Sequence, residues 1–249
     1  MSQAARAPDI RSQPPLLQKL ASMNLLTSGS PASYNLAELL GAQINLSDSI
    51  SLARALTSLE KIKTSDSLSM ERPQRQFLNA RGGMIRFVLR SFEANETAIP
   101  FMLPQANQAT LDDPAEAIKP YQRFYSLHQS EMDHRVTTLR KSLRASLALD
   151  GPPRSKLANL DRILDDTLGE YGRKVLARLP KMLVARFALH REEFLNSATA
   201  DQPIAPANWQ HSGGWLHGFH QDIKQLLLAE LDLRLLPARA LLEALETQD

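Results

Sequence analysis

Cysteine is absent from the 249-residue sequence. Disulfides, thiolate nucleophiles and zinc or iron–sulfur sites with Cys ligands are therefore excluded. Aromatic residues are also few, at 6%, and no apolar run approaches the roughly 20 residues needed to cross a bilayer. The most apolar stretch, Leu226–Leu236, is interrupted by Glu230, Asp232 and Arg234. Since the amino terminus also lacks the apolar core of a signal peptide, the sequence predicts a cytoplasmic protein.

Nucleotide-binding and hydrolase motifs are missing as well. The sequence contains neither G-x-x-x-x-G-K-[S/T] nor G-x-G-x-x-G, the glycine patterns that cradle phosphates. The grouping Gly213-Gly214-x-x-x-Gly218 follows no predicted strand. We therefore predict no catalytic residues, no cofactor-binding residues and no cofactor, which favours a protein that is not an enzyme.

Residues that favour helices dominate what remains. Leu, Ala, Arg, Gln and Glu are abundant, and straight-chain residues lose little rotamer freedom in a helix. Apolar residues make up 43% of the chain and charged residues 22%, which is typical of a globular protein. We predict an all-α fold, an irregular helical bundle centred on a long antiparallel helical hairpin.

Composition divides the chain into four predicted regions. They are a disordered arm over 1–13, a helical region over 14–95, a Pro-rich linker or surface loop over 96–120, and a helical bundle over 121–249. Within the second region, helices are expected at about 14–26, 35–42, 46–62 and 72–95. Gly82 and Gly83 predict a break in the last of these, because each costs about 1 kcal/mol relative to Ala in a helix interior.

The helical hairpin begins at Tyr121. Apolar residues recur every three to four positions from there to Leu147, and a second run continues from Leu157 toward Leu195. A connection around Pro152–Ser155 joins the two runs as antiparallel neighbours. Pro180 lacks an amide donor, so the second helix must kink or restart there.

The second run also carries a heptad seam, and two more helices are predicted after it. The seam residues are Leu168, Val175, Met182 and Leu189. Residues 197–213 read as another Pro-bearing linker. The helices that follow are predicted at about 215–236 and 238–245, on either side of Pro237.

Two histidine groups are candidate metal ligands. His128, Glu131 and His134 lie at i,i+3 spacing, as in carboxylate-bridged di-metal bundles, but the sequence offers no second such motif. The alternative is that His128 is hydrogen-bonded in the core while the other two are solvated. A second group consists of His211, His217 and His220, of which His217 and His220 have the i,i+3 spacing that can reach one zinc ion. We predict no metal site and keep a metal-dependent helical-bundle enzyme as an alternative.

Basic residues are concentrated in the middle of the chain. Residues 72–191 hold 20 basic and 12 acidic side chains, whereas 192–249 hold 3 and 9. The basic helices 72–90 and 135–156 suggest a nucleic-acid-binding regulator, although no nucleic-acid-binding motif accompanies them. A solvated helix face is the simpler interpretation. The candidate basic surface consists of Arg81, Arg86, Arg90, Arg140, Lys141 and Arg144.

Three passages carry a resemblance to a known family. They are YQRFYSLHQSEMDHRVTTLRKSLRASL from Tyr121, LANLDRILDDTLGEYGRKVLARLPKMLVARF from Leu157, and GWLHGFHQDIKQLLLAELDLRLLPARALLEAL from Gly214. The chain resembles an uncharacterised proteobacterial family of about this length, catalogued as a domain of unknown function. The most specific matching positions are Tyr125, His128, Gln129, Met132, Leu139, Arg140, Pro180 and Pro237.

This resemblance bears on function only through the genes that lie beside those of family members. Members of the family tend to be encoded beside motor-stator-like inner-membrane proteins and envelope proteins similar to outer-membrane protein A. The resemblance therefore implies a cytosolic accessory to a cell-envelope complex. The leading prediction is a protein–protein interaction or adaptor protein, either a homo-oligomer or a component of such a complex, that does not itself span a membrane.

Overall fold

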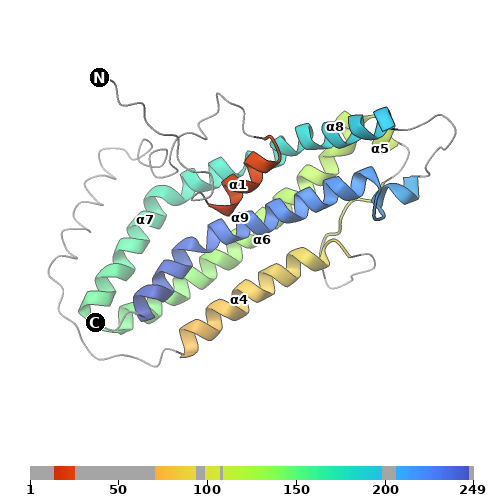
Figure 1. Cartoon of the computed structure of the whole chain (residues 1–249). Coiled ribbons are helices and arrows are strands. Elements are labelled where there is room, and N and C mark those ends of the chain that lie inside the picture. Colours follow the sequence, from red (N-terminus) through yellow and green to blue (C-terminus); the bar gives the residue numbers. More distant parts are fainter. Residues whose placement is uncertain (1–13, 26–70, 94–98, 107–108, 198–205, 247–249) are drawn as a thin grey trace, which may run out of the picture. The chain divides into compact units, whose positions relative to one another are not determined.

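The computed structural model describes residues 14–25, 71–93, 99–106, 109–197 and 206–246, and the regular structure of this part of the chain is helical (Figure 1). The predicted all-α class is confirmed. The predicted arm over 1–13 and helices at 35–42 and 46–62 lie outside the described residues. Among the described helices, none has the length and apolarity of a membrane-spanning segment. The helices are α1 (Pro15–Ser22), α4 (Glu71–Arg90), α5 (Ala109–Asp112), α6 (Pro114–Leu149), α7 (Pro152–Leu176), α8 (Leu179–Ser197), the 3-10 helix η3 (Pro206–Gln210) and α9 (Trp215–Glu246).

Helix α4 runs without interruption through Gly82 and Gly83, so the predicted break there is wrong. The helix buries Phe77 before the glycines and Met84 and Val88 after them, at 8%, 2% and 0% exposure. Burial of one such side chain contributes roughly 1.5–3 kcal/mol. That gain on both sides of the glycine pair exceeds the intrinsic cost of the two glycines.

Helix α6 begins at Pro114 rather than at the predicted Tyr121, so the end of the predicted Pro-rich linker is helical. Asp113 caps the helix, because its Oδ1 accepts a hydrogen bond from the Glu116 amide at 3.1 Å. Pro114 occupies the first turn, where a missing amide proton costs nothing. Pro120 then lies inside the helix without ending it.

The connection from α6 to α7 is shorter than the predicted one around Pro152–Ser155. Only Asp150 and Gly151 separate the two helices, since α7 already begins at Pro152. Gly151 has φ 92°, a left-handed conformation that glycine adopts without a Cβ clash.

The break predicted at Pro180 is confirmed. α7 ends at Leu176 and α8 begins at Leu179, which places Pro180 in the first turn of the new helix. The predicted heptad seam is not a buried stripe, because Leu168, Val175 and Met182 are only half-buried and Leu189 is 37% exposed.

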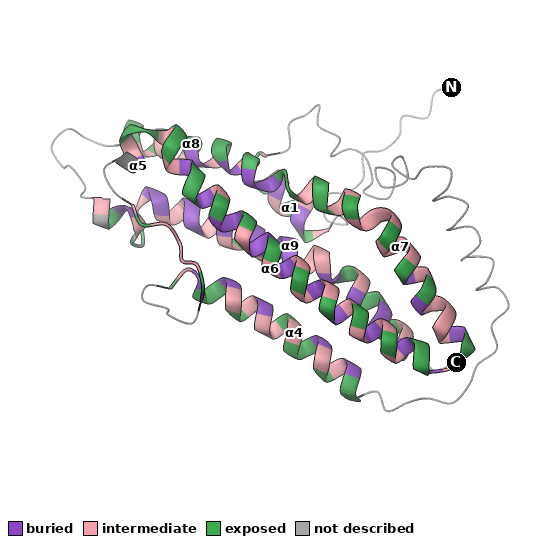
Figure 2. Ribbon diagram, turned by 180° about the vertical axis from the view of Figure 1, so that it is seen from behind, coloured by how far each residue is buried: buried purple, intermediate pink, exposed green. Residues whose placement is uncertain are grey.

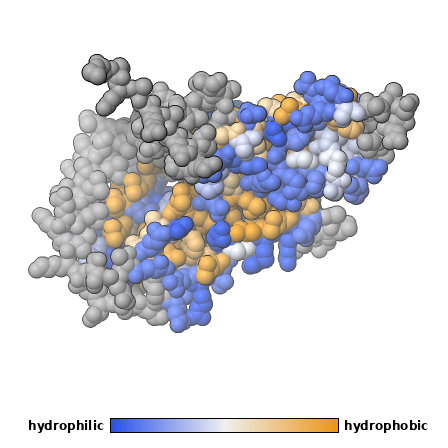
Figure 3. Space-filling model, viewed as in Figure 1, coloured by the Kyte–Doolittle hydropathy of each residue, from blue (hydrophilic) through white to orange (hydrophobic). Residues whose placement is uncertain are grey.

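Helix α9 extends through Pro237 to Glu246, so the predicted division into two helices is wrong. Leu235 precedes the proline, and Ala238 and Leu241 follow it, with exposures of 3%, 0% and 5%. The buried face therefore continues past Pro237, and its packing holds the chain helical there. Apolar side chains also gather over α9 on the face shown in Figure 3.

The chain groups into two compact units, each drawing on several segments. Unit 1 collects most of the aromatic side chains: Phe187 lies 5.2 Å from Phe219 and 5.4 Å from Trp215 between ring centroids. Unit 2 has an aliphatic core, in which Leu143 and Leu147 of α6 are fully buried (Figure 2). Unit 1 comprises Met1–Ser33, Ile85–Ser130 and Ala177–Leu233, and unit 2 comprises Tyr34–Met84, Glu131–Leu176 and Arg234–Asp249.

Candidate interaction surface

A buried carboxylate joins α6 to α9 inside unit 1. Glu230 of α9 is 0% exposed. It accepts a hydrogen bond from the Tyr125 hydroxyl at 2.8 Å and from the Gln129 amide nitrogen at 3.1 Å. Because a buried acceptor without donors would be costly, these two α6 side chains fix the position of Glu230 in the core.

Tyr121 and His220 form a second buried polar contact in the same unit. His220 Nε2 lies 3.3 Å from the Tyr121 hydroxyl. Burial, helped by the positive charges of His217 and Lys224, lowers the pKa of His220 to about 3. Burial raises the pKa of Tyr121 above its ordinary value. Both groups are therefore neutral at pH 7, and they contribute packing rather than a charge.

A third polar cluster ties α8 to α9. The Asp222 carboxylate accepts hydrogen bonds from Arg186 at 2.5 and 2.8 Å and lies 2.9 Å from His190 Nε2. Burial opposes ionisation of Asp222, but the hydrogen bonds from His190 and Arg186 and the Arg186 charge outweigh it and lower the pKa. A Cβ on Gly218 would lie 3.0 Å from the His190 ring. The glycine thus leaves the space that the imidazole occupies.

His128 is buried and hydrogen-bonded at both ring nitrogens. Nδ1 lies 3.0 Å from the Phe124 carbonyl and Nε2 lies 2.9 Å from the Ser91 hydroxyl. Because a carbonyl only accepts, the contact with Phe124 places a proton on Nδ1. The Ser91 hydroxyl also lies 2.8 Å from the Val88 carbonyl, and its single proton serves either that carbonyl or Nε2. Aromatic rings complete its surroundings, with Phe101 at 4.9 Å. The core-histidine interpretation describes His128 correctly.

The other two members of the candidate metal motif lie in unit 2. Glu131 forms an ion pair with Arg135 at 2.6 Å, and His134 is exposed while its carbonyl accepts the Thr138 hydroxyl at 2.9 Å. In the second histidine group, His211 is exposed and His220 is buried. Within the described ranges, no three His, Asp or Glu side chains are grouped closely enough to hold a metal ion.

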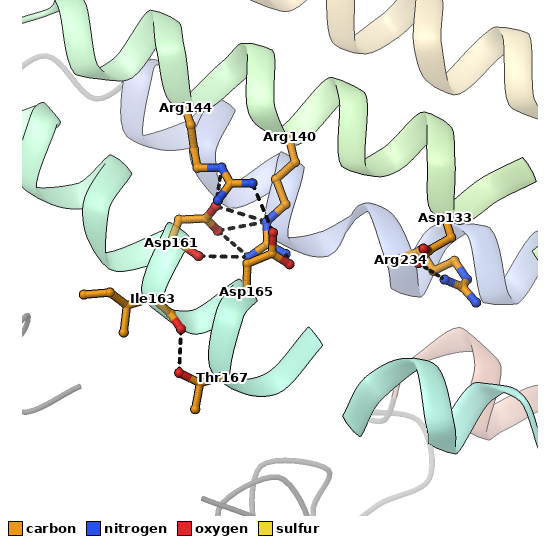
Figure 4. A network of polar contacts seen from close by, with 8 residues as sticks. All are labelled: Asp133, Arg140, Arg144, Asp161, Ile163, Asp165, Thr167 and Arg234. Carbon is orange, nitrogen blue, oxygen red and sulfur yellow. Dashed lines mark hydrogen bonds and ion pairs between the residues drawn. The ribbon is translucent and has the colours of Figure 1, made fainter. Parts of the chain in front are cut away.

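Two of the candidate basic residues belong to an ion-pair network between α6 and α7 in unit 2 (Figure 4). Arg140 contacts Asp161 at 2.6 Å and Asp165 at 2.7 Å. Arg144 contacts the same two carboxylates at 3.3 and 3.0 Å. Both arginine side chains are only 13% exposed, so they hold the hairpin together and present little charge to solvent.

The remaining candidate basic residues lie on helix surfaces. Arg81, Arg86 and Arg90 are exposed on α4, and Lys141 is exposed on α6. Nucleic-acid binding stays a prediction. These four residues would have to make the phosphate contacts without Arg140 and Arg144.

A groove of about 300 Å³ lies between α4 and α6 in unit 2. Gly83 lines it, and a Cβ added there would meet nothing within 4 Å. Two of its polar side chains already bond to neighbours: Gln76 donates to Ser142 at 2.7 Å, and Arg135 pairs with Glu131. The groove therefore lies at a helix–helix contact that the missing side chain of Gly83 leaves open.

Helix α8 is apolar on two sides. Its inner side buries Leu179, Leu183 and Phe187. Its opposite side, which we call the outer face of α8, consists of Lys181, Val184, Ala185, Ala188, Leu189, Glu192 and Leu195, all exposed (Figure 2).

The outer face of α8 leaves large aliphatic side chains in water. Val184, Leu189 and Leu195 are 45%, 37% and 43% exposed. Single exposed leucines are ordinary, but an apolar stripe along one helix marks an interaction surface. The heptad seam predicted Leu189 to be a packed position, so the exposed outer face of α8 was not predicted. The signal was present in the sequence, because apolar residues between 179 and 195 recur too densely for one stripe.

Sequence comparison identifies one family. The family described as "Protein of unknown function (DUF3348)" matches residues 1–247 of the chain. No curated protein and no solved structure gives a significant match.

Proposed function

The chain belongs to the DUF3348 family of proteins of unknown function, and we propose that it is a non-enzymatic helical adaptor that binds another protein through the outer face of α8. The observation that carries this proposal is the exposure of Val184, Leu189 and Leu195 on a helix whose other side is already buried. Covering such side chains with a partner removes apolar area from water, at roughly 25 cal/mol per Å².

The interior polar groups support a structural rather than a chemical role. Glu230, Asp222 and His128 each bond to neighbouring side chains or backbone within unit 1. These bonds join helices to one another or fix a ring in the core. We therefore assign the buried polar residues to holding the binding surface in place.

The proposed location of the protein is the cytoplasm. Its proposed partner is a protein of an inner-membrane or cell-envelope complex, or a second copy of the chain. The family resemblance supports the envelope setting through the genes beside its members. The absence of a membrane-spanning helix among the described residues is compatible with it.

A photo-crosslinking amino acid at Ala188 tests the proposal in cells that naturally produce the protein. Ala188 lies on the outer face of α8, so we expect a covalent adduct with a protein. Val184→Lys should remove most of that adduct, because a charge at the face opposes its burial. The same probe at Arg123, an exposed residue of α6, is the matched control. No adduct at Ala188, or equal adducts at both positions, would reject the proposal.

A further inference from the structure

The outer face of α8 is self-complementary in an antiparallel pair of helices. We propose that the face binds a second copy of this chain, α8 against α8, around a two-fold axis that passes between the two helices at the level of Arg186 and Phe187. The inference rests on the proposed function, since it names the partner of the same surface. A two-fold interface of this kind uses one patch twice, so each contact occurs in two equivalent copies.

The register follows from the positions of the exposed residues. With the axis between Arg186 and Phe187, Val184 of one copy lies level with Leu189 of the other, and Ala185 lies level with Ala188. All four are exposed in the isolated chain. At 3.6 residues per turn, Val184 and Leu189 stand on opposite edges of the outer face. The pair therefore flanks the central alanines with aliphatic side chains on both sides. Alanines at the centre let the helix axes approach to the lower end of the ordinary range of about 8–10 Å.

The same register brings opposite charges together at the two ends of the contact. Lys181 of one copy lies level with Glu192 of the other, and the two-fold axis repeats the pair. Both side chains are exposed, and neither has a hydrogen bond or ion pair with any residue in the described ranges. They are therefore available to a partner. Parallel packing in register would instead place Lys181 beside Lys181 and Glu192 beside Glu192, which like-charge repulsion disfavours.

The size of the face sets the strength of the association. α8 has 19 residues, which corresponds to a length of about 28 Å. One pair of helices of this length buries less surface than the roughly 1,200–2,000 Å² that a stable interface buries. We infer a reversible dimer that forms with rising concentration, with a dissociation constant on the order of tens of micromolar.

Charge exchange on the full chain tests both the partner and the register, with sedimentation velocity as the readout. Lys181→Glu places two glutamates opposite each other at both ends, and Glu192→Lys places two lysines there. Each variant alone should dimerise about 10-fold more weakly than the unmodified chain. An equimolar mixture of the two should regain dimers, because every end then pairs Lys with Glu. The double variant Lys181→Glu/Glu192→Lys should regain them alone.

Controls separate register from general charge effects. Lys141→Glu makes the same change in net charge at an exposed residue of unit 2, and it should leave the dimer unchanged. The differences should shrink in about 1 M salt, where the Debye length falls to about 3 Å. Helicity by circular dichroism checks that each variant is folded, and all substituted side chains are exposed.

The outcomes distinguish this inference from the proposed function. A chain that stays monomeric to several hundred micromolar overturns the self-pairing, and so does a mixture that fails to regain dimers. If the Ala188 probe still forms an adduct with a different protein in cells, the adaptor proposal stands without self-pairing. If the probe forms no adduct and the chain stays monomeric, both fail.

Discussion

At the scale of single residues, the interior of unit 1 is built around polar groups that satisfy one another. Glu230 receives hydrogen bonds from Tyr125 and Gln129, and His220 contacts the Tyr121 hydroxyl. A buried polar group costs little while its partners are present and several kcal/mol once one is removed. Stability should therefore respond far more strongly to substitutions here than at surface charges.

Glu230→Ala should lower the free energy of unfolding by about 3 kcal/mol, because it leaves the Tyr125 hydroxyl and the Gln129 amide without their buried acceptor. Chemical denaturation at neutral pH measures the loss. The control is Glu243→Ala on the same helix, whose ion pair with Arg239 is 57% exposed at the glutamate. That variant should change stability by less than about 0.5 kcal/mol. Equal losses in the two variants would contradict the assignment of Glu230 to the core.

Protonation of His220 should make folding pH-dependent. Its pKa in the folded chain, about 3, lies below the ordinary value of 6.5, so the unfolded chain binds the proton first as the pH falls. The stability that the neutral His220 side chain contributes is complete above pH 6.5 and declines from there toward pH 3. Between pH 7.5 and 5, we expect His220 alone to account for a loss of about 2 kcal/mol.

Denaturation curves of His220→Gln and of the unmodified chain at both pH values test this. The variant should lose about 2 kcal/mol less than the unmodified chain across that interval. His211→Gln, at an exposed histidine, should retain the full pH dependence. An unchanged slope in His220→Gln would show that His220 is not buried as a neutral ring.

At the scale of helices, burial on either side of a breaker decides whether a helix continues. Pro120 lies between buried Ile118 and Tyr121, and α6 continues. Pro180 also has a buried neighbour, Leu179, but its ring would crowd the carbonyl of Leu176, and α7 ends at that residue, before the exposed Ala177 and Arg178. A proline costs about 3 kcal/mol in a helix interior, so it is tolerated where apolar burial exceeds that amount. Apolar burial on both sides of the glycine pair likewise keeps α4 uninterrupted.

Glycine substitutions should separate intrinsic propensity from packing. Gly83→Ala should stabilise the protein by about 0.5–1 kcal/mol, because the helix is continuous there and a Cβ meets nothing within 4 Å. Gly214→Ala should destabilise it, since the Cβ would lie 2.6 Å from the Asn208 carbonyl oxygen and closer still to that of Trp209. Thermal unfolding of both variants measures the two signs. Destabilisation by Gly83→Ala would indicate that α4 bends at the glycine pair.

At the scale of the whole molecule, the uneven charge is partly neutralised inside the fold. Residues 72–191 carry an excess of basic side chains, yet Arg140 and Arg144 are paired with Asp161 and Asp165. Two of the six candidate basic residues are therefore engaged in holding α6 to α7. The charge pattern favours intramolecular pairing over a surface for nucleic acid.

Fluorescence anisotropy with a short labelled DNA duplex tests this interpretation. Between about 50 mM and about 200 mM salt, we expect no steep fall in DNA affinity, because the protein would neutralise few phosphates. Steep salt-dependent binding would support the nucleic-acid regulator instead. Lys141→Glu would then be expected to weaken binding, as would a substitution of Arg86.

The sequence by itself determined the all-helical class and the break at Pro180, because these follow from local propensity and a missing amide donor. Only the tertiary structure decided that α4 passes through two glycines and α9 through Pro237, since both depend on burial by distant segments. The same limit applies to the outer face of α8. The periodicity of Leu189 suggested a core position, and only the packed structure revealed which side of that helix the protein leaves for a partner.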